Sequence, residues 1–324
     1  MDSVLLMDSP HPPLLQTTRV RLRTLSKLMA AKQWVWKNFQ TPESSLYGFD
    51  GTTNVNLVTT FPLYAPLTAG RYEDKSQSTI ETINRIFPIL SDFAEAQTGK
   101  QLNPVDIREF STSSTDLLSA HELKKCLDSQ GSDKANPHNY HMLYGPLLKN
   151  RDHIRRLLEI GIGTSNVDVL SNMGSGGKPG ASLRAFRDYL PKAEIYGADI
   201  DERILFEEDR IKTYYLDQTD ATSFDKLRTV VPPELDLIID DGLHSPEANL
   251  NTVIFGLTRI KRGGWLVVED IAPDAIPFWK LVSALLPANY PSRILTAAGF
   301  MRGRDGNFSL NDRAAALFAV QRLE

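Results

Sequence analysis

The segment from 157 to 201 constrains the fold of this chain most strongly. It reads LLEIGIG, a loop rich in glycine and serine, GASLRAFRDYLP and AEIYGADID. The two apolar runs have the length of buried strands, and the residues before the second run have helical spacing, so we expect a βαβ unit. In sheets built from such units, ligands bind beyond the carboxyl ends of the strands. The segment therefore predicts a nucleoside-binding site.

The turn after the first run favours S-adenosylmethionine over NAD. Gly161 and Gly163 allow the backbone to bend sharply and to approach a ligand closely, but the third glycine of the dinucleotide fingerprint is absent. Asp199 ends the second run, where a carboxylate can accept both ribose hydroxyls. Glu159 would repel a pyrophosphate, whereas it suits the ammonium group of the methionine portion. The alternative is a turn of a parallel sheet with a capping acid.

Further apolar runs follow at the spacing of an alternating sheet. Residues 210–220, 234–244 and 263–271 read as strands, and residues 245–264 supply a helix and a turn. Alternating strands and helices with right-handed crossovers predict a doubly wound parallel α/β sheet. Residues 293–300 and 314–323 indicate an antiparallel C-terminal strand pair.

Two of the predicted strands end in acidic clusters. Asp240, Asp241 and His244 end one, and Glu269 and Asp270 end the next. Because neighbouring parallel strands finish at the same edge, these side chains can converge, and so many acids in one place need a cation. Oxygen ligands without cysteine suit Mg²⁺ or Mn²⁺, and histidine suits a general base at neutral pH. The alternatives are helix N-caps at the two aspartates and a surface histidine.

Residues 1–130 have a different character and predict a mostly helical N-terminal region, which we interpret as a lid, a substrate contact or an oligomer contact. Residues 17–39 have helical spacing with a basic outer face, and residues 48–70 read as loop or short strand. Residues 131–324 form the predicted cofactor-binding domain.

The best helix prediction in that region covers residues 77–99. Ser78 and Glu81 resemble a capping box at its start, and Gly99 should end it. Pro88 should kink the helix or divide it in two.

Composition restricts the classes of partner. The chain has 324 residues, a formal net charge of −4 and a pI near 5.9, so it has no basic footprint for nucleic acid, and a small-molecule substrate fits better. Its single cysteine, Cys126, excludes an intramolecular disulfide and a thiolate metal cluster. No apolar run is long enough to span a membrane, and no basic leader precedes the first apolar patch. We expect a cytoplasmic protein without a membrane partner.

From about Gly131 onward, the chain resembles the metal-dependent S-adenosylmethionine O-methyltransferases of antibiotic biosynthesis. It is most similar to the macrolide-sugar group, the mycinamicin and macrocin O-methyltransferases, with the aminocoumarin sugar enzymes and the cephalosporin hydroxylase-like family nearby. The matching strings are GSDK, HNYHMLYGPLL, LLEIGIG, GASLRAFRDYLPKAEIYGADID, LDQTD, IIDDGLH and VVEDI. The resemblance implies a class I methyltransferase fold, Rossmann-like and doubly wound, and a homo-oligomer, either dimer or tetramer.

The resemblance also implies the roles of individual residues. It places Mg²⁺ on Asp241, Glu269 and Asp270 and makes His244 the catalytic base. Asp217 and Gln218 should lie near the adenine. The complete expected cofactor-binding set is Glu159, Gly161, Gly163, Asp199, Asp217, Gln218 and Asp240.

Two features depart from that family. Leu243 replaces the usual serine before the histidine, which concerns the lining of the pocket. The link from 164 to 179 is longer than usual and is either a mobile cover over the cofactor or a surface loop.

The expected activity is transfer of a methyl group from S-adenosylmethionine to a hydroxyl of a sugar or polyketide-like secondary metabolite, with Mg²⁺ or Mn²⁺ as second cofactor. Two alternatives stay open. The first is a catalytically inactive scaffold or subunit that binds the cofactor, since a fold does not prove an activity. The second is an NAD-dependent oxidoreductase, which would leave the acidic strand ends unexplained.

Overall fold

The structure is a computed structural model, and it describes residues 72–100, 102–297 and 315–323. The chain divides into two units, residues 1–80 and 81–324, and the sheet belongs to the second. The strands are β1 (Val105–Asp106), β2 (Arg156–Ile160), β3 (Glu194–Asp199), β4 (Glu207–Glu208), β5 (Ile211–Tyr215), β6 (Leu235–Asp240), β7 (Ile260–Ile271), β8 (Ser292–Thr296) and β9 (Ala316–Gln321). The helices are α3 (Tyr72–Thr98), α4 (Ser114–Gln130), α5 (His141–Leu147), α6 (Ala181–Tyr189), α7 (Ala221–Val230), α8 (Pro246–Gly256) and α9 (Ile276–Leu285).

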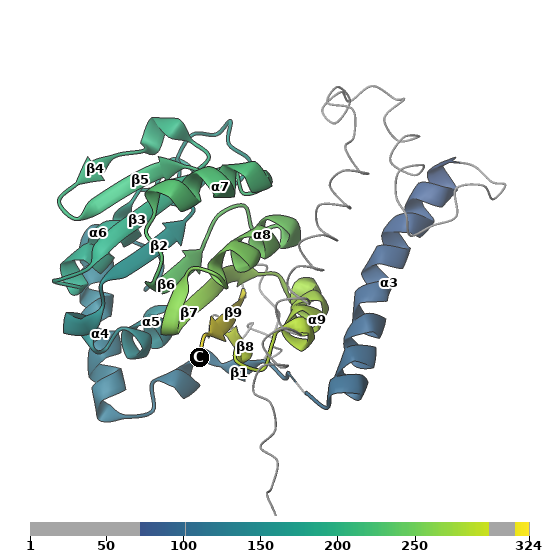
Figure 1. The fold of residues 1–324 in the computed structure, drawn as a ribbon. Helices are drawn as coiled ribbons and strands as arrows, with labels where there is room; N and C mark the ends of the chain where they lie inside the picture. Colours follow the sequence, from purple (N-terminus) through teal and green to yellow (C-terminus); the bar gives the residue numbers. More distant parts are fainter. Residues whose placement is uncertain (1–71, 101, 298–314, 324) are drawn as a thin grey trace, which may run out of the picture. The chain divides into compact units, whose positions relative to one another are not determined.

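The strands form one nine-stranded sheet in the order β1-β8-β9-β7-β6-β2-β3-β5-β4 (Figure 1). β2 lies parallel to both β3 and β6, and β6 lies parallel to β7, as the alternating pattern predicts. β9 lies antiparallel between β7 and β8. The predicted fold class, a doubly wound sheet with an antiparallel C-terminal strand pair, is confirmed.

Successive strand residues point to opposite faces of the sheet and build two cores. Leu157 of β2 belongs to the core beneath α4, α5 and α6, whereas its neighbour Leu158 belongs to the core beneath α7, α8 and α9 (Figure 1). This alternation follows from the two-residue period of a strand. Because both faces are covered, consecutive apolar residues occur within the central strands, as in the Leu237–Ile239 run of β6.

α4 begins and ends with strong local signals. The side chain of Ser113 accepts a hydrogen bond from the Asp116 N–H, and the Asp116 carboxylate accepts one from the Ser113 N–H, which is a complete capping box. Gly131, at φ 78°, ends the helix. α4 precedes the predicted domain boundary at 130/131, yet its Leu123 and Leu127 are fully buried in the core. The boundary stays a prediction.

The N-terminal predictions need one correction. α3 begins at Tyr72, so the predicted helix start at Ser78 is wrong. The preceding residues YEDKSQ contain no helix breaker and extend the helix toward the N-terminus. α3 is not divided at Pro88, and it ends before Gly99 at φ 65°, as predicted. The predictions for 17–39 and 48–70 lie outside the described residues.

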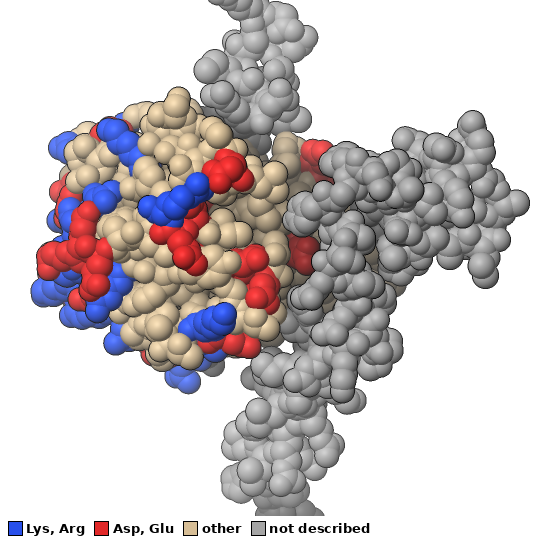
Figure 2. Space-filling view, turned by 90° about the horizontal axis from the view of Figure 1, so that it is seen from above, with Lys and Arg blue, Asp and Glu red and all other residues tan. Residues whose placement is uncertain are grey.

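The distribution of surface charge and the character of the helices were predicted from composition and can be compared with the structure. In the view of Figure 2, acidic and basic side chains lie interspersed among uncharged ones over the described part of that face. Within the described ranges, no helix combines the length and the apolar character that a membrane crossing requires.

Candidate active site

The turn after β2 brings two parts of the site together. Gly161 adopts φ 84°, and a Cβ added to it would lie 2.0 Å from the backbone oxygen of Asp241. Asp241 in turn donates its N–H to the Ile160 oxygen at 2.7 Å. Only glycine fits this close approach, which joins the predicted cofactor turn to the predicted metal acids. Gly163 also has a positive φ of 80°.

Asp199 lies directly beneath the same turn. Its Oδ2 accepts a hydrogen bond from the Ile162 N–H at 2.9 Å, and its Oδ1 accepts one from the Asp201 N–H at 2.9 Å. Burial raises the pKa of Asp199, and the two backbone N–H groups oppose this effect. The carboxylate therefore fixes the turn, and it lies at the end of β3, where the sequence predicts a contact with ribose hydroxyls.

Asp240 and Gln218 form a second buried pair beside the turn. Nε2 of Gln218 donates to Oδ1 of Asp240 at 2.8 Å, and Oε1 of Gln218 accepts the Leu243 N–H at 2.8 Å. Asp240 is fully buried, and burial raises its pKa. Asp217 caps its own turn by accepting the Thr219 N–H at 2.8 Å. These contacts bring the ends of β5 and β6 together.

Glu159 is fully buried at the end of β2. One carboxylate oxygen accepts a hydrogen bond from Oγ of Ser182 at 2.7 Å, and the other lies 3.2 Å from Nζ of Lys134. Burial raises the pKa of Glu159, and the charge of Lys134 opposes that effect. Both oxygens are thus engaged within the protein, so the predicted contact of Glu159 with the cofactor stays a prediction.

Asp241, His244 and Asp270 converge at the ends of β6 and β7. One ligand atom from each lies within 4.8 Å of the others. Nε2 of His244 is 3.9 Å from Oδ1 of Asp241 and 3.9 Å from Oδ2 of Asp270. The three side chains are between 25% and 30% exposed, so the group is open to a ligand.

The backbone at this group is strained. His244 and Asp270 have φ values of 56° and 55°, which are uncommon for residues other than glycine. The pairing of β7 with β9 shifts between Val268 and Ile271, so a bulge lies at Glu269 and Asp270. A bulge redirects the side chains that it contains. Strain of this kind concentrates at functional sites.

Sequence reasoning missed three residues that line the acids. Nζ of Lys134 lies 2.6 Å from Oδ2 of Asp241 and 2.5 Å from Oε2 of Glu269. The hydroxyl of Tyr140 donates to Oδ1 of Asp270, and that of Tyr144 donates to Oε1 of Glu269. Glu269 is therefore enclosed by Lys134 and Tyr144 and is not part of the open three-residue group.

The charges of these groups depend on one another. Burial alone would lower the pKa of Lys134, but the adjacent carboxylates of Asp241, Glu269 and Glu159 raise it well above its usual range. Burial raises the pKa values of Tyr140 and Tyr144, and the neighbouring carboxylates raise them further. Lys134 is thus a fixed cation, and both phenols stay protonated hydrogen-bond donors.

His138 and His141, three positions apart in the sequence, lie in different surroundings. Nδ1 of His138 lies 3.9 Å from Oδ1 of Asp270, at the edge of the open group. His141 instead packs in the core, where burial, followed by the charge of Lys124, lowers its pKa to about 4. The two rings do not form a common site.

The longer link from 164 to 179 contacts the site from one side. Oγ of Ser171 donates to the Gly242 oxygen at 3.0 Å, and Asp168 forms an ion pair with Arg203 at 3.0 Å. Val167 and Leu170 are more than four-fifths exposed. The segment is anchored at defined points while presenting apolar side chains outward.

The residues present fit both expected cofactors. Hard carboxylate oxygens from Asp241 and Asp270, with an imidazole between them, are suitable for a divalent cation such as Mg²⁺ or Mn²⁺. The glycine turn and the strand-end carboxylate of Asp199 are suitable for a nucleoside.

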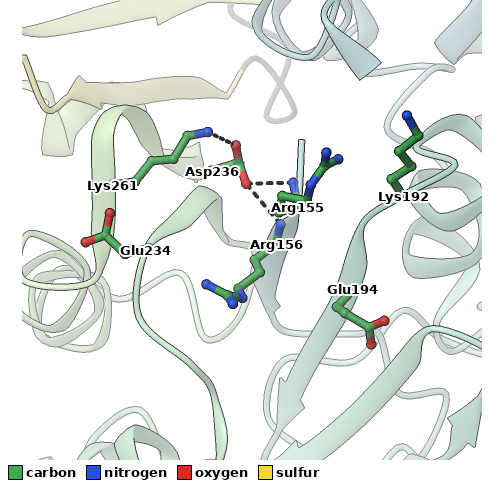
Figure 3. A pocket seen from close by; sticks show the side chains of 7 residues that line it. All are labelled: Arg155, Arg156, Lys192, Glu194, Glu234, Asp236 and Lys261. Atoms are coloured by element: carbon green, nitrogen blue, oxygen red, sulfur yellow. Dashed lines mark hydrogen bonds and ion pairs between the residues drawn. The ribbon is translucent and has the colours of Figure 1, made fainter. Parts of the chain in front are cut away.

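A hollow of about 330 Å³ lies at the opposite edge of the sheet, near the amino ends of the strands (Figure 3). Asp236 organises it by accepting the N–H groups of Arg155 and Arg156 at 2.8 and 3.0 Å and by pairing with Lys261. Lys192 pairs with Asp152. Several of its charged groups thus pair within the protein, and Asp236 joins the starts of β2, β6 and β7.

The chain is similar in sequence to several curated O-methyltransferases. No protein-family model matches the chain. It is 29% identical over 180 residues to an 8-demethyl-8-alpha-L-rhamnosyl tetracenomycin-C 2'-O-methyltransferase of Streptomyces olivaceus, a match that covers 50% of this chain and 45% of the relative. It is 34% identical over 117 residues both to the mycinamicin VI 2''-O-methyltransferase of Micromonospora griseorubida and to the demethylmacrocin O-methyltransferase of Streptomyces fradiae. Each of these two matches covers 36% of this chain and 27% of the relative.

Among solved structures, the MycE methyltransferase of the mycinamycin pathway, in complex with Mg and SAH, gives a TM-score of 0.40 at 27% identity. That match covers 46% of this chain and 39% of MycE. The chain spans less than half the length of the curated relatives it matches. These relatives are sugar O-methyltransferases, and the resemblance predicted from the sequence is confirmed.

Proposed function

We propose that this chain is a Mg²⁺-dependent O-methyltransferase that transfers a methyl group from S-adenosylmethionine to a hydroxyl of a sugar or polyketide-like secondary metabolite. The observation that carries the proposal is the contact between Gly161 and Asp241. Through it, the cofactor turn of β2 and the open acidic group of β6 share one edge of the sheet. The curated relatives, whose names describe O-methylation of sugars in antibiotic pathways, support the same reaction.

Some of these residues would bind the metal and the cofactor, and one would deprotonate the acceptor hydroxyl. Asp241 and Asp270 would hold the metal. Glu269 would complete the predicted set, because each of its oxygens has a further lone pair beside its contact with Lys134 or Tyr144. Asp199 would accept hydrogen bonds from the ribose hydroxyls. His244 would take the proton from the acceptor hydroxyl, because its Nε2 lies 3.9 Å from both Asp241 and Asp270 and its side chain is 30% exposed. When bound, S-adenosylmethionine supplies an electrophilic methyl group, and Mg²⁺ lowers the pKa of the acceptor hydroxyl.

The remaining predicted cofactor contacts are part of the proposal. Gly161 and Gly163 allow the backbone to approach the ligand, while Glu159, Asp217, Gln218 and Asp240 shape the pocket around it. Val167 and Leu170, which are exposed on the 164–179 segment, are suitable contacts for an apolar part of the acceptor. We also propose a homo-oligomer, which light scattering of the purified chain would test.

Calorimetric titration with S-adenosylhomocysteine, with Mg²⁺ and again with EDTA, tests the proposal. We expect binding in both buffers and an additional heat when Mg²⁺ is added to the complex. Absence of binding in both would contradict the proposal and lead to titration with NAD. Binding of cofactor and metal without turnover of any sugar acceptor would favour the inactive scaffold.

A further inference from the structure

Each acid of the predicted metal set has at least one carboxylate oxygen held by a side chain from residues 134–144. Oδ2 of Asp241 accepts from Lys134 at 2.6 Å, and Oδ1 of Asp270 accepts from the hydroxyl of Tyr140. Glu269 is held on both oxygens, as described above. The segment therefore contacts the acids of two different strands.

The other oxygens of Asp241 and Asp270, which are not held in this way, both approach the His244 ring. Oδ1 of Asp241 and Oδ2 of Asp270 are each 3.9 Å from Nε2 of His244. A carboxylate that is fixed at one oxygen cannot rotate freely, so the other oxygen keeps a defined direction. The hydrogen bonds from Lys134 and Tyr140 thus determine which oxygens converge.

The cost of burying these donors indicates that the contacts matter. Lys134 is 2% exposed, Tyr140 is 1% exposed and Tyr144 is fully buried. A buried ammonium or hydroxyl group is unfavourable unless it has a polar partner, and these groups find theirs in the strand-end acids. Phenylalanine in place of either tyrosine would fill the same space without needing such a partner.

We propose that Tyr140, together with Lys134 and Tyr144, is a positioning residue that orients the carboxylates of Asp270, Asp241 and Glu269 toward a divalent cation. This inference rests on the metal site of the proposed function. It assigns a role to residues 134–144, which lie between β1 and β2 in the chain. The residues act through the acids and do not themselves contact the metal.

The test is Tyr140→Phe in the full chain, titrated with Mn²⁺ alone by calorimetry. This change removes one hydroxyl and keeps the charge of the site. It therefore tests the orientation of the Asp270 carboxylate separately from the electrostatic attraction of the site for a cation. Loss of a residue that orients metal ligands typically lowers metal affinity tenfold or more, and we expect about a tenfold loss. The matched control is Tyr189→Phe, because Tyr189 is equally buried but donates to the Ser119 oxygen at 3.4 Å, away from the acids.

The outcomes separate this inference from the proposed function. We expect Tyr140→Phe to bind S-adenosylhomocysteine like the unmodified chain, since a general loss of structure would weaken both ligands. Mn²⁺ affinity equal to that of the unmodified chain would overturn the positioning role alone. Failure of the unmodified chain to bind Mn²⁺ would overturn the metal site as well. If Tyr140→Phe does not fold, Tyr144→Phe tests the same role through Glu269, with the same two titrations.

Discussion

The ammonium group of Lys134 lies 2.6 Å from Oδ2 of Asp241, although 107 positions separate the two residues in the chain. The acids at the ends of β6 and β7 therefore do not form the candidate site alone. The turn between α4 and α5 supplies their counter-charge and their hydrogen-bond donors. The site depends on packing that is remote in sequence.

Asp241→Asn should abolish metal-dependent turnover and leave cofactor affinity nearly unchanged. The substitution removes a negative charge and one hard oxygen from the open group, and Mg²⁺ and Mn²⁺ bind mainly through such oxygens. Calorimetry with Mn²⁺ and with S-adenosylhomocysteine measures the two affinities separately. Asp225→Asn, at a side chain 77% exposed, is the control. Full activity of Asp241→Asn in metal-free buffer would contradict the metal role.

His244→Ala should lower kcat by about a hundredfold, the usual effect of losing a positioned base. Because His244 has a φ of 56°, His244→Asn is a useful second variant, since asparagine tolerates this backbone region better than alanine. Both variants should still bind Mn²⁺ if the histidine is a base rather than a ligand. An unchanged kcat would place the base elsewhere.

Gly161→Ala should destabilise the protein strongly. The left-handed backbone costs an alanine about 1–2 kcal/mol, and the contact of its Cβ with the Asp241 oxygen adds an overpacking cost of about 1–3 kcal/mol. Gly263→Ala is the matched control, since Gly263 has a φ of 76° but open space around the added Cβ. Urea denaturation should show the larger loss of unfolding free energy for Gly161→Ala. Equal losses would mean that the close approach is relieved by local movement.

His141 should make the stability of the protein fall in mild acid. Its pKa is about 4 in the folded state, against an ordinary value of 6.5. Between these two values the unfolded chain binds a proton that the folded chain does not, so the free energy of unfolding decreases as the pH falls from 6.5 toward 4. The effect is at most on the order of 3 kcal/mol.

Denaturation of His141→Gln across that pH range checks this prediction. The variant should show a shallower dependence of unfolding free energy on pH than the unmodified chain. His153→Gln, which removes an exposed histidine, controls for the loss of a histidine as such. A slope unchanged by His141→Gln would exclude the buried ring as its source.

The sheet and its acidic edge were predictable because their signals are local. Continuous apolar runs that end in an acid or a glycine mark buried parallel strands, and the acids at 241 and 270 lie where those runs stop. β1 could not be predicted, because it has only two residues and forms by pairing with β8, far along the chain. α4 was missed although Ser113 and Asp116 give it a complete capping box.

The donors around the acids could not be derived in the same way. Lys134 and Tyr140 lie in a turn without periodicity, and a lysine in such a turn normally faces solvent. Only the resemblance of the GSDK and HNYHMLYGPLL strings marked this segment. The ion pair between Glu159 and Lys134 could not be predicted from the sequence either, because it depends on how the turn packs on the sheet.

The place of β9 between β7 and β8 has a consequence for synthesis on the ribosome. Residues 316–321 are translated after all the other strands of the described ranges, yet they pair with both of these neighbours. Until that stretch leaves the exit tunnel, the nascent chain exposes two unsatisfied strand edges, and β1 and β8 have no link to the rest of the sheet. Completion of the sheet is thus a late step, and chaperone protection matters most just before it.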